Sequence, residues 1–224
     1  DDSPTLPRFN PTATSPADIY PVASLWPDYE GAYLKETATR YLAELKTAPA
    51  PELYEILKLT SFGQAYTAQN PSPKTLSLTV TQAELLLFYR CLVYLSSSAQ
   101  YLRSEKDIAM RSQEEGIPTD VLRSMVRRFF DCDPKTEHYL FSAANKNKAR
   151  NFALIACFHL KDFRLSPTDL NLIKADFKIT DVVLKKTLDQ LGANAAAGFA
   201  KDRAYTLKPP LKFPENTRRK KRKH

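Results

Sequence analysis

Proline spacing restricts the start of this chain to extended segments and short helices. Four prolines fall within the first sixteen residues, at positions 4, 7, 11 and 16. Proline donates no backbone hydrogen bond and fixes φ, so this spacing excludes a helix or a central strand. We therefore expect residues 1–16 to form an extended, proline-rich arm. Ser15 followed by Pro16 then has the pattern of a helix N-cap with proline at the first helical position.

The next part of the chain predicts three helices and a hairpin. Apolar spacing and proline boundaries favour helices at residues 28–36, 38–47 and 51–59. Residues 64–68 and 75–80 alternate in polarity and are rich in Thr, Val and Tyr, and an Asn-Pro-Ser-Pro-Lys turn separates them. Three helices followed by a hairpin is the order of a winged-helix domain, which we place at residues 17–80.

A longer helix is expected at residues 81–103, opened by a capping box from Thr81 to Glu84. Its apolar residues, from Leu85 to Leu102, alternate in spacings of three and four, as in a helix that packs along a partner helix. The partner is either a second copy of the chain, in a coiled coil, or another part of the same chain. We favour the second, since the stripe covers only about three heptads, and expect a monomer. With a further helix at 119–130, residues 81–130 form a helical linker.

The C-terminal part repeats the first pattern. We expect helices at 146–162, 167–175 and 181–191, with Ser166 and Thr180 as N-caps and Gly192 in a left-handed C-terminal cap. Residues 204–213 are extended and complete a second hairpin. The sequence thus predicts a mainly α fold with small β-hairpin wings: tandem winged-helix domains at 17–80 and 131–213, joined by the helical linker. Residues 214–224 form a basic tail that we expect to be disordered.

Charge is distributed unevenly along the chain. Residues 1–116 contain 10 Lys and Arg against 14 Asp and Glu, whereas residues 117–224 contain 23 against 11. A polyanion is one partner that fits this second part, and a solvated lysine-rich surface is the alternative. We favour the polyanion, because the excess remains when the terminal run of cations is removed.

Particular cations are candidates for contact with DNA. In a helix-turn-helix the last helix enters the major groove, and here Lys185, Lys186 and Gln190 should lie on its outer face. Lysines suit phosphates, and no Arg or Asn on that face suits a base edge, so we expect binding with little sequence preference. The alternative is a protein contact. The remaining DNA-binding candidates are Lys146, Lys148 and Arg150, which open a helix where cations are unfavourable without an anionic partner, and Lys201 and Arg203 at the wing tip.

The tail holds an unbroken run of cations: Arg218, Arg219, Lys220, Lys221, Arg222 and Lys223. Nuclear import, nonspecific binding of nucleic acid and simple solvation all fit such a run. We favour a nuclear localisation signal.

Several classes of function lack their motifs. With 5 glycines the chain holds no phosphate-binding glycine loop. Its 3 cysteines form no Cys-x-x-Cys pair, lie in apolar runs and should be buried free thiols. We find no catalytic residues, no metal ligands and no cofactor motif, and no apolar run is long enough to cross a membrane.

Three segments of the sequence carry a family resemblance. They are LPRFNPTATSPADIYPVASLWP, EEGIPTDVLRSMVRRFF and KNKARNFALIACFHLKDFRLSPTDL. They resemble the C-terminal region of the RNA polymerase I-specific subunit of forty-nine kilodaltons, and the similarity runs from about Leu6 to Phe213.

The resemblance implies a tandem winged-helix fold like that of the TFIIE beta subunit. It further implies a non-catalytic DNA-directed RNA polymerase subunit in the nucleus and nucleolus, which binds double- or single-stranded DNA and supports initiation and elongation on ribosomal DNA. Other RNA polymerase I subunits are its expected partners. The family's N-terminal dimerisation module has no counterpart here, so we expect a fragment of a longer protein. The alternative function is a scaffold that docks on the polymerase without touching DNA.

Overall fold

A computed structural model describes residues 5–68, 72–197 and 203–213. Within these ranges the α-helices are α1 (Pro16–Ile19), α2 (Asp28–Glu44), α3 (Glu52–Leu57), α4 (Ser61–Thr67), α5 (Val80–Ser98), α6 (Glu105–Glu115), α7 (Thr119–Phe129), α8 (Ala143–Leu160), α9 (Pro167–Phe177) and α10 (Asp181–Gln190). Short 3₁₀ turns are η1 (Val22–Ser24), η2 (Pro73–Thr75) and η3 (Ala99–Tyr101). The strands are β1 (Asp131–Cys132), β2 (Tyr139–Leu140), β3 (Arg164–Leu165), β4 (Asn194–Ala195) and β5 (Tyr205–Thr206).

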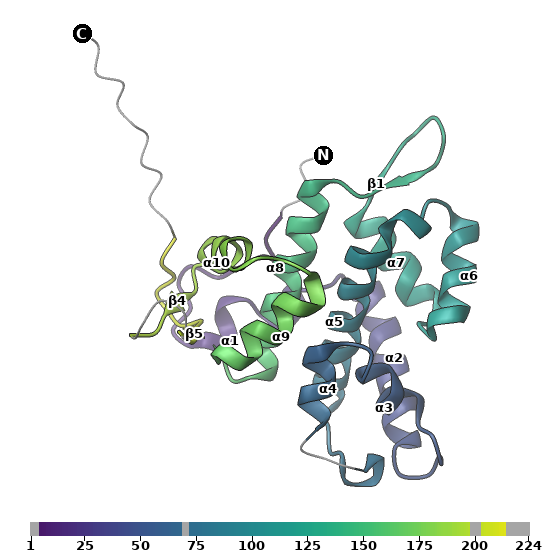
Figure 1. Ribbon diagram of the computed structural model, residues 1–224, viewed down its shortest axis with the longest axis horizontal. Helices are drawn as coiled ribbons and strands as arrows, with labels where there is room; N and C mark the ends of the chain where they lie inside the picture. Colours follow the sequence, from purple (N-terminus) through teal and green to yellow (C-terminus); the bar gives the residue numbers. More distant parts are fainter. Residues whose placement is uncertain (1–4, 69–71, 198–202, 214–224) are drawn as a thin grey trace.

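Helix α5 lies at the centre of the molecule, between α2 and α8 (Figure 1). Of its 19 residues, 12 are buried, and every residue from Leu85 to Leu95 is among them. A run of eleven residues covers all sides of a helix, so α5 is enclosed rather than buried on one face. The predicted apolar stripe is therefore covered by helices of the same chain.

The start of α5 differs from the prediction by two residues. Thr79, not Thr81, is the N-cap: its side chain accepts a hydrogen bond from the Gln82 amide at 3.1 Å, and Gln82 Oε1 accepts one from the Thr79 amide at 2.9 Å. Thr79 with Gln82 and Thr81 with Glu84 both have the spacing of a capping box, and the position of the buried helix face decides which of the two forms. The helix also ends earlier than predicted. It stops at Ser98, and a Ser104–Asp107 capping box then opens α6.

The first half of the chain lacks the predicted hairpin. Residues 64–67 belong to α4, and the described residues between Ala68 and Val80 contain no strand. The polarity alternation of QAYTA was misleading, because the Thr60 side chain caps the Gly63 amide at 3.0 Å and starts a helix there. The two helices predicted at 28–36 and 38–47 are also one continuous helix, α2, since no proline or glycine interrupts the segment between them.

The second half agrees more closely with the prediction. Helices α9 and α10 begin after Ser166 and Thr180, whose side chains accept from the amides of Asp169 and Val183. Gly192 has φ 76° and ends α10 in the left-handed region as predicted. Helix α8 starts three residues earlier than expected, because a Ser142–Asn145 capping box precedes its basic residues.

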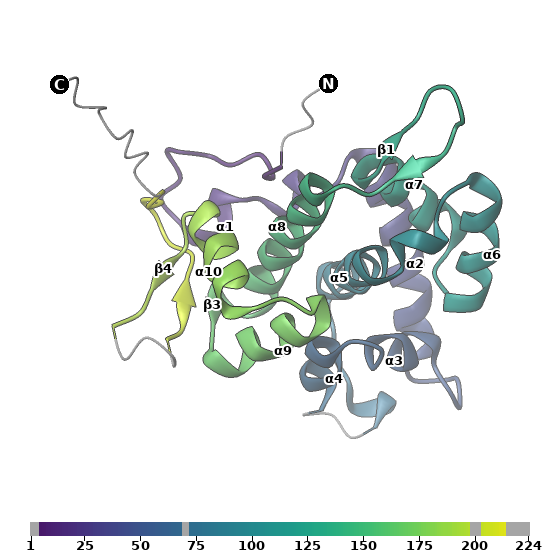
Figure 2. The same cartoon turned by 45° about the horizontal axis from the view of Figure 1, so that its top comes forward.

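Three short strands form a small antiparallel sheet beside α10. Its order is β3–β5–β4, with Leu165 opposite Tyr205 and Ala195 opposite Tyr205 on the other side. The β4–β5 pair confirms the C-terminal hairpin. A second hairpin, β1–β2, follows α7 and projects from the opposite end of the molecule (Figure 2). The fold is therefore mainly α with small antiparallel sheets, as predicted.

The N-terminal arm packs on the second half of the chain. The Thr5 carbonyl accepts a hydrogen bond from Asn151 Nδ2 at 3.0 Å, and the Tyr20 hydroxyl donates to the Leu191 carbonyl at 2.9 Å. His159 Nε2 lies 2.6 Å from the Tyr20 carbonyl oxygen, and burial lowers the pKa of this imidazole. The described part of the N-terminal segment, from Thr5 to Tyr20, is thus joined to α8 and to the end of α10 by polar contacts.

The carboxylate of Asp176 connects the two halves. It lies near the end of α9 and accepts hydrogen bonds from the Ser61 amide at 2.6 Å and the Phe62 amide at 3.0 Å, at the start of α4. The Tyr89 hydroxyl of α5 donates to the same group at 2.6 Å. One continuous cluster contains buried side chains from residues 17–80, 81–130 and 131–213. The predicted domain boundaries stay a prediction.

The cysteines do not share one environment. Cys91 and Cys157 are buried free thiols as expected, but Cys132 is exposed. The expectation for Cys132 was wrong because its apolar run ends in the β1–β2 hairpin, where β1 lies at the surface.

We predict that Asp176→Asn lowers the free energy of unfolding by about 1–3 kcal/mol, because an amide offers one acceptor oxygen to three donors. Urea denaturation followed by circular dichroism measures the change. Asp162→Asn is the matched control, since Asp162 is an exposed acid of the same half of the chain. Equal stability of the two variants would contradict the structural role of Asp176.

We further predict that the protein sediments as a monomer over a wide range of concentration, because the apolar residues of α5 are already covered by α2 and α8. Analytical ultracentrifugation checks this. A species of twice the mass that grows with concentration would show that another surface associates.

Candidate nucleic-acid interface

Helix α10 presents two lysines to solvent. Leu184, Leu188 and Leu191 are buried against the core, and Lys185 and Lys186 lie on the opposite, exposed side, as predicted. Lys185 Nζ donates to Asp189 Oδ2 at 2.6 Å, and this hydrogen bond raises the pKa of Lys185. The two lysines lie on a helix face that is fixed by its buried leucines.

The other candidates near α10 have different outcomes. Gln190 is half-buried with its Oε1 enclosed, so its placement on the outer face was wrong: it follows Asp189 towards the C-terminal cap, where the chain turns back on the core. Arg203 is exposed two residues before β5. Lys201 lies outside the described residues, as do Arg218 to Lys223 of the tail.

The structure adds four exposed cations to this region that the sequence argument did not single out. They are Arg164 on β3, Lys178 in the α9–α10 turn, and Lys208 and Lys212 after β5. Lys178 adopts a left-handed φ of 52°, which ends α9 and turns its side chain away from the helix. Arg164 lies near the residues that follow β5 because β3 pairs with β5. A strand of two residues is too short to show periodicity, so the sequence pattern does not reveal this pairing.

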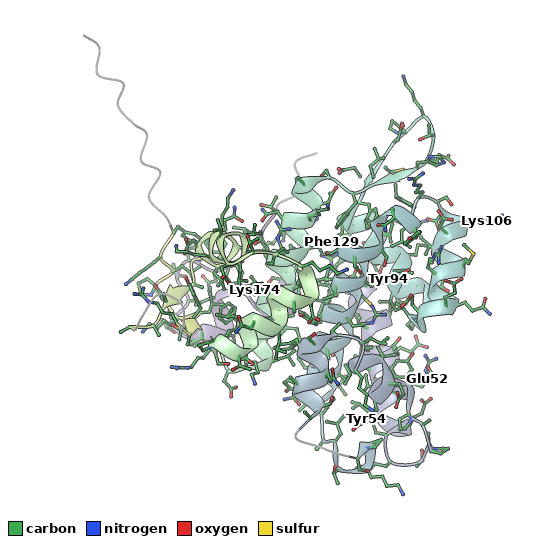
Figure 3. The ribbon with its side chains drawn as sticks, in the orientation of Figure 1. Glu52, Tyr54, Tyr94, Lys106, Phe129 and Lys174 are labelled. Carbon is green, nitrogen blue, oxygen red and sulfur yellow. The ribbon has the colours of Figure 1, made fainter. Side chains whose placement is uncertain are left out.

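Together these residues give the second half a cationic surface. Of the described residues from 161 to 213, the exposed basic ones are Arg164, Lys178, Lys185, Lys186, Arg203, Lys208 and Lys212, and the exposed acidic ones are Asp162 and Asp181. Asp181 is neutralised by Lys174, whose Nζ donates to it at 2.7 Å from α9, the helix on which Figure 3 labels Lys174. These cations belong to α10, the turn before it and the β3–β5–β4 sheet with the residues that flank it.

The three candidates at the start of α8 do not form a surface. Lys146 is exposed, Arg150 is half-buried, and Lys148 is only 6% exposed. Lys148 Nζ donates to the Arg128 carbonyl at 2.9 Å and lies over the Phe129 ring. The prediction that Lys148 lies on an exposed helix face was therefore wrong, and its contact with DNA stays a prediction. Residues 146 and 150 are four apart and share one face of the helix, whereas residue 148 lies on the opposite side.

Lys148 belongs to a buried charged cluster, which we define as Glu30, Arg128 and Lys148. Glu30 is fully buried, and its carboxylate accepts from Arg128 Nε at 3.2 Å and Nη2 at 2.5 Å. Burial raises the pKa of Glu30, against the opposing effect of Arg128. Burial and the like charge of Arg128 lower the pKa of Lys148 to about 8. Phe129, labelled near the middle of the molecule in Figure 3, lies under both cations.

Two arginines of the helical linker, Arg123 and Arg127, form hydrogen bonds with an acidic residue of the protein. Arg123 Nε and Arg127 Nη2 each donate to the Glu105 carboxylate at 2.9 Å, and Tyr139 donates to it at 2.6 Å. These hydrogen bonds lower the pKa of Glu105, although its partial burial acts in the opposite direction. The linker therefore contributes less cationic surface than its sequence suggests.

The described residues contain no group of His, Cys, Asp and Glu side chains that could hold a metal ion. Among the helices described, none has the length and apolar character needed to cross a membrane.

The chain is thus a mainly helical protein with small antiparallel sheets and a concentrated cationic surface on its second half. The family model of A49-like RNA polymerase I associated factors matches residues 1–214, and the chain belongs to this family. No curated protein matches the sequence. Family membership confirms the resemblance seen in the sequence and makes the protein an accessory factor in transcription by RNA polymerase I, which implies a nuclear location.

We predict that the free energy of unfolding rises with pH from about pH 8 to about pH 10 relative to Lys148→Met. In this window the unfolded chain keeps the Lys148 proton, while the folded protein, with its lowered pKa, releases it, so raising the pH favours the folded state. Urea titrations of both proteins across the window measure the difference, in which the other titrating groups cancel. A difference that stays constant would mean that Lys148 keeps an ordinary pKa.

Proposed function

We propose that this protein is a DNA-binding accessory module of RNA polymerase I that supports initiation and elongation on ribosomal DNA. The observation that carries the proposal is the exposed cationic surface made by α10, the turn before it and the β3–β5–β4 sheet. A group of exposed cations such as this one suits contacts with phosphates and gains affinity by releasing counterions.

The proposed fold of this region is a winged helix. The second half has three helices, with β3 between the first and second and the β4–β5 hairpin after the third. In that class of domain the third helix, here α10, faces DNA, and the hairpin approaches the backbone beside it. The first half has the short helix α1 followed by α2, α3 and α4, and its described residues form no hairpin, so within a tandem winged-helix arrangement its module is the more divergent one.

Contacts with phosphates, rather than bases, fit this surface. Lys185 and Lys186 are point charges without the planar, bidentate geometry that reads a base edge. Phosphate contacts position a protein but carry no sequence information. We therefore propose largely sequence-nonspecific binding, as suits a factor that stays with a polymerase moving along its template, on double- or single-stranded DNA.

Further proposals follow from family membership. The protein acts without catalysis, with other RNA polymerase I subunits as partners and the nucleolus as its site of action. The cation run from Arg218 to Lys223 fits a nuclear localisation signal.

One observation favours a second function, a scaffold that docks on the polymerase without DNA. Val182, three residues before Lys185 on α10, is 77% exposed, and an exposed β-branched side chain on this helix suits a protein partner better than a phosphate backbone.

We predict that Lys185→Gln combined with Lys186→Gln weakens binding to duplex DNA and makes the slope of log affinity against log salt shallower by about 1.8, or about 0.9 for each lost phosphate contact. Fluorescence anisotropy with a labelled duplex at several salt concentrations measures both quantities.

Lys35→Gln combined with Lys46→Gln is the matched control, since both lysines are exposed on or just after α2 in the first half. This pair should leave the slope unchanged. Equal slopes for both double variants, or no binding by the parent protein at low salt, would favour the scaffold.

A further inference from the structure

A cleft separates the N-terminal arm from the main body of the protein. It encloses about 340 Å³, and its walls come from the arm, from the segment around η1, and from α7 and α8. This volume lies within the range of small-molecule sites. Figure 2 shows the arm passing beside α8, to which Asn151 holds it through the Thr5 carbonyl.

The charged groups that line the cleft are all positive. They are Arg8 from the arm, Arg128 from α7 and Lys148 from α8, and the lining drawn from the described residues holds no carboxylate. Arg8 is exposed, whereas the Arg128 side chain is 15% exposed and Lys148 6%. Two of the three cations are therefore held in a largely desolvated wall, where an anion would interact with them strongly.

The internal bonds of these cations hold them in fixed orientations. Arg128 uses Nε and Nη2 on Glu30, and its Nη1 takes no part in that ion pair. The Arg128 guanidinium lies 4.5 Å from the Phe129 ring centre and Lys148 Nζ 5.1 Å from it, so both are held against the same ring. Both cations are therefore fixed in the wall of the cleft.

Aromatic rings accompany the cations in the lining. Trp26 and Phe152 both border the cleft. Trp26 packs against Phe88 with ring centres 5.1 Å apart, and a Cβ at Gly31 would lie 2.8 Å from its ring, so glycine at this position leaves room for the indole. Fixed aromatic rings beside fixed cations suit a ligand that carries both a phosphate and a flat base.

We propose that this cleft binds a nucleotide, with its phosphate on Arg8, Arg128 and Lys148 and its base against Trp26 and Phe152. The ligand is a phosphate monoester, either on a free nucleotide or at the 5′ end of a DNA strand, because an internal phosphate of a duplex cannot reach a lysine so deeply buried. The site lies apart from α10 and is independent of the DNA-binding surface proposed above.

The protein contains its own probe for this site. Trp26 is the only tryptophan of the chain, so its fluorescence reports on the cleft alone. We expect thymidine 5′-monophosphate to change the emission saturably, and inorganic phosphate to bind at least about tenfold more weakly because it lacks the base. No saturable change, or equal affinity for both anions, overturns the proposal.

Charge variants test the phosphate contacts. Arg8→Gln should weaken nucleotide binding about tenfold, as expected for the loss of one charge-assisted contact. Arg40→Gln, an exposed arginine of α2 outside the cleft, should not change it. Equal affinity of the Arg8→Gln variant and the parent overturns the assignment. Lys185→Gln with Lys186→Gln should leave nucleotide binding intact, which separates this site from the DNA surface.

The pH dependence gives an independent readout. The groups that face Lys148 are Arg128, which lowers its pKa, and Glu30 and Asp131, which raise it; Arg8 shares the cleft wall. Nucleotide affinity should fall about tenfold from about pH 7 to about pH 9, as Lys148 loses its proton while the phosphate stays dianionic. In Lys148→Met this fall should disappear. If that variant does not fold, the parent's pH profile and Arg8→Gln still decide, and a flat profile overturns the role of Lys148.

Oligonucleotides separate the two sources of the ligand. A short single strand with a 5′-phosphate should compete with the mononucleotide if the cleft holds a strand end, and the same strand with a 5′-hydroxyl should not. Competition by neither strand assigns the site to a free nucleotide. Equal competition by both strands overturns the monoester assignment.

Discussion

The burial of α5 on every side between Leu85 and Leu95 is the constraint on which the rest of this structure depends. A helix buried on every side needs neighbours on every side, and α2 and α8, from opposite halves of the chain, supply most of them. Asp176 adds a polar connection, since it caps the start of α4 and accepts from Tyr89 of α5 at once. The halves therefore stabilise each other through a shared core, and the cationic surface of the second half rests on a frame that includes the first.

The sequence predicted the caps and turns at helix ends better than the pairing of strands that are distant in sequence. The caps at Ser166 and Thr180 and the turn at Gly192 were all correct, because each depends on a few neighbouring residues. The hairpin expected at residues 64–80 was wrong, because alternation over five residues also fits one face of a short helix such as α4. Strands of two residues, such as β3, carry no periodicity at all and are defined only by their partners.

The residues of the candidate site also show that local features were predicted better than contacts between distant parts of the chain. Lys185 and Lys186 were correctly placed on an outer face, since the leucines of α10 fix which side is buried. Lys148 was misplaced because the sequence gives no sign that Arg128 and Glu30, far away along the chain, form a polar cluster that accepts a buried ammonium. Lys146, Lys148 and Arg150 are thus close in sequence, but in the helix the first is exposed, the second is buried and the third is half-buried.

These cations divide into two kinds with different physical roles. Those of α10 and the sheet are hydrated and screened by salt, so they favour fast, reversible contact with a polyanion. Arg128 and Lys148 are desolvated, and such charges are costly to bury unless a partner repays that cost in full. Glu30 bonds the Arg128 guanidinium, and the Lys148 ammonium donates to the Arg128 carbonyl. Burial and the like charge of Arg128 lower the pKa of Lys148, and an anion in the adjoining cleft would act in the opposite direction by favouring the charged form of the lysine.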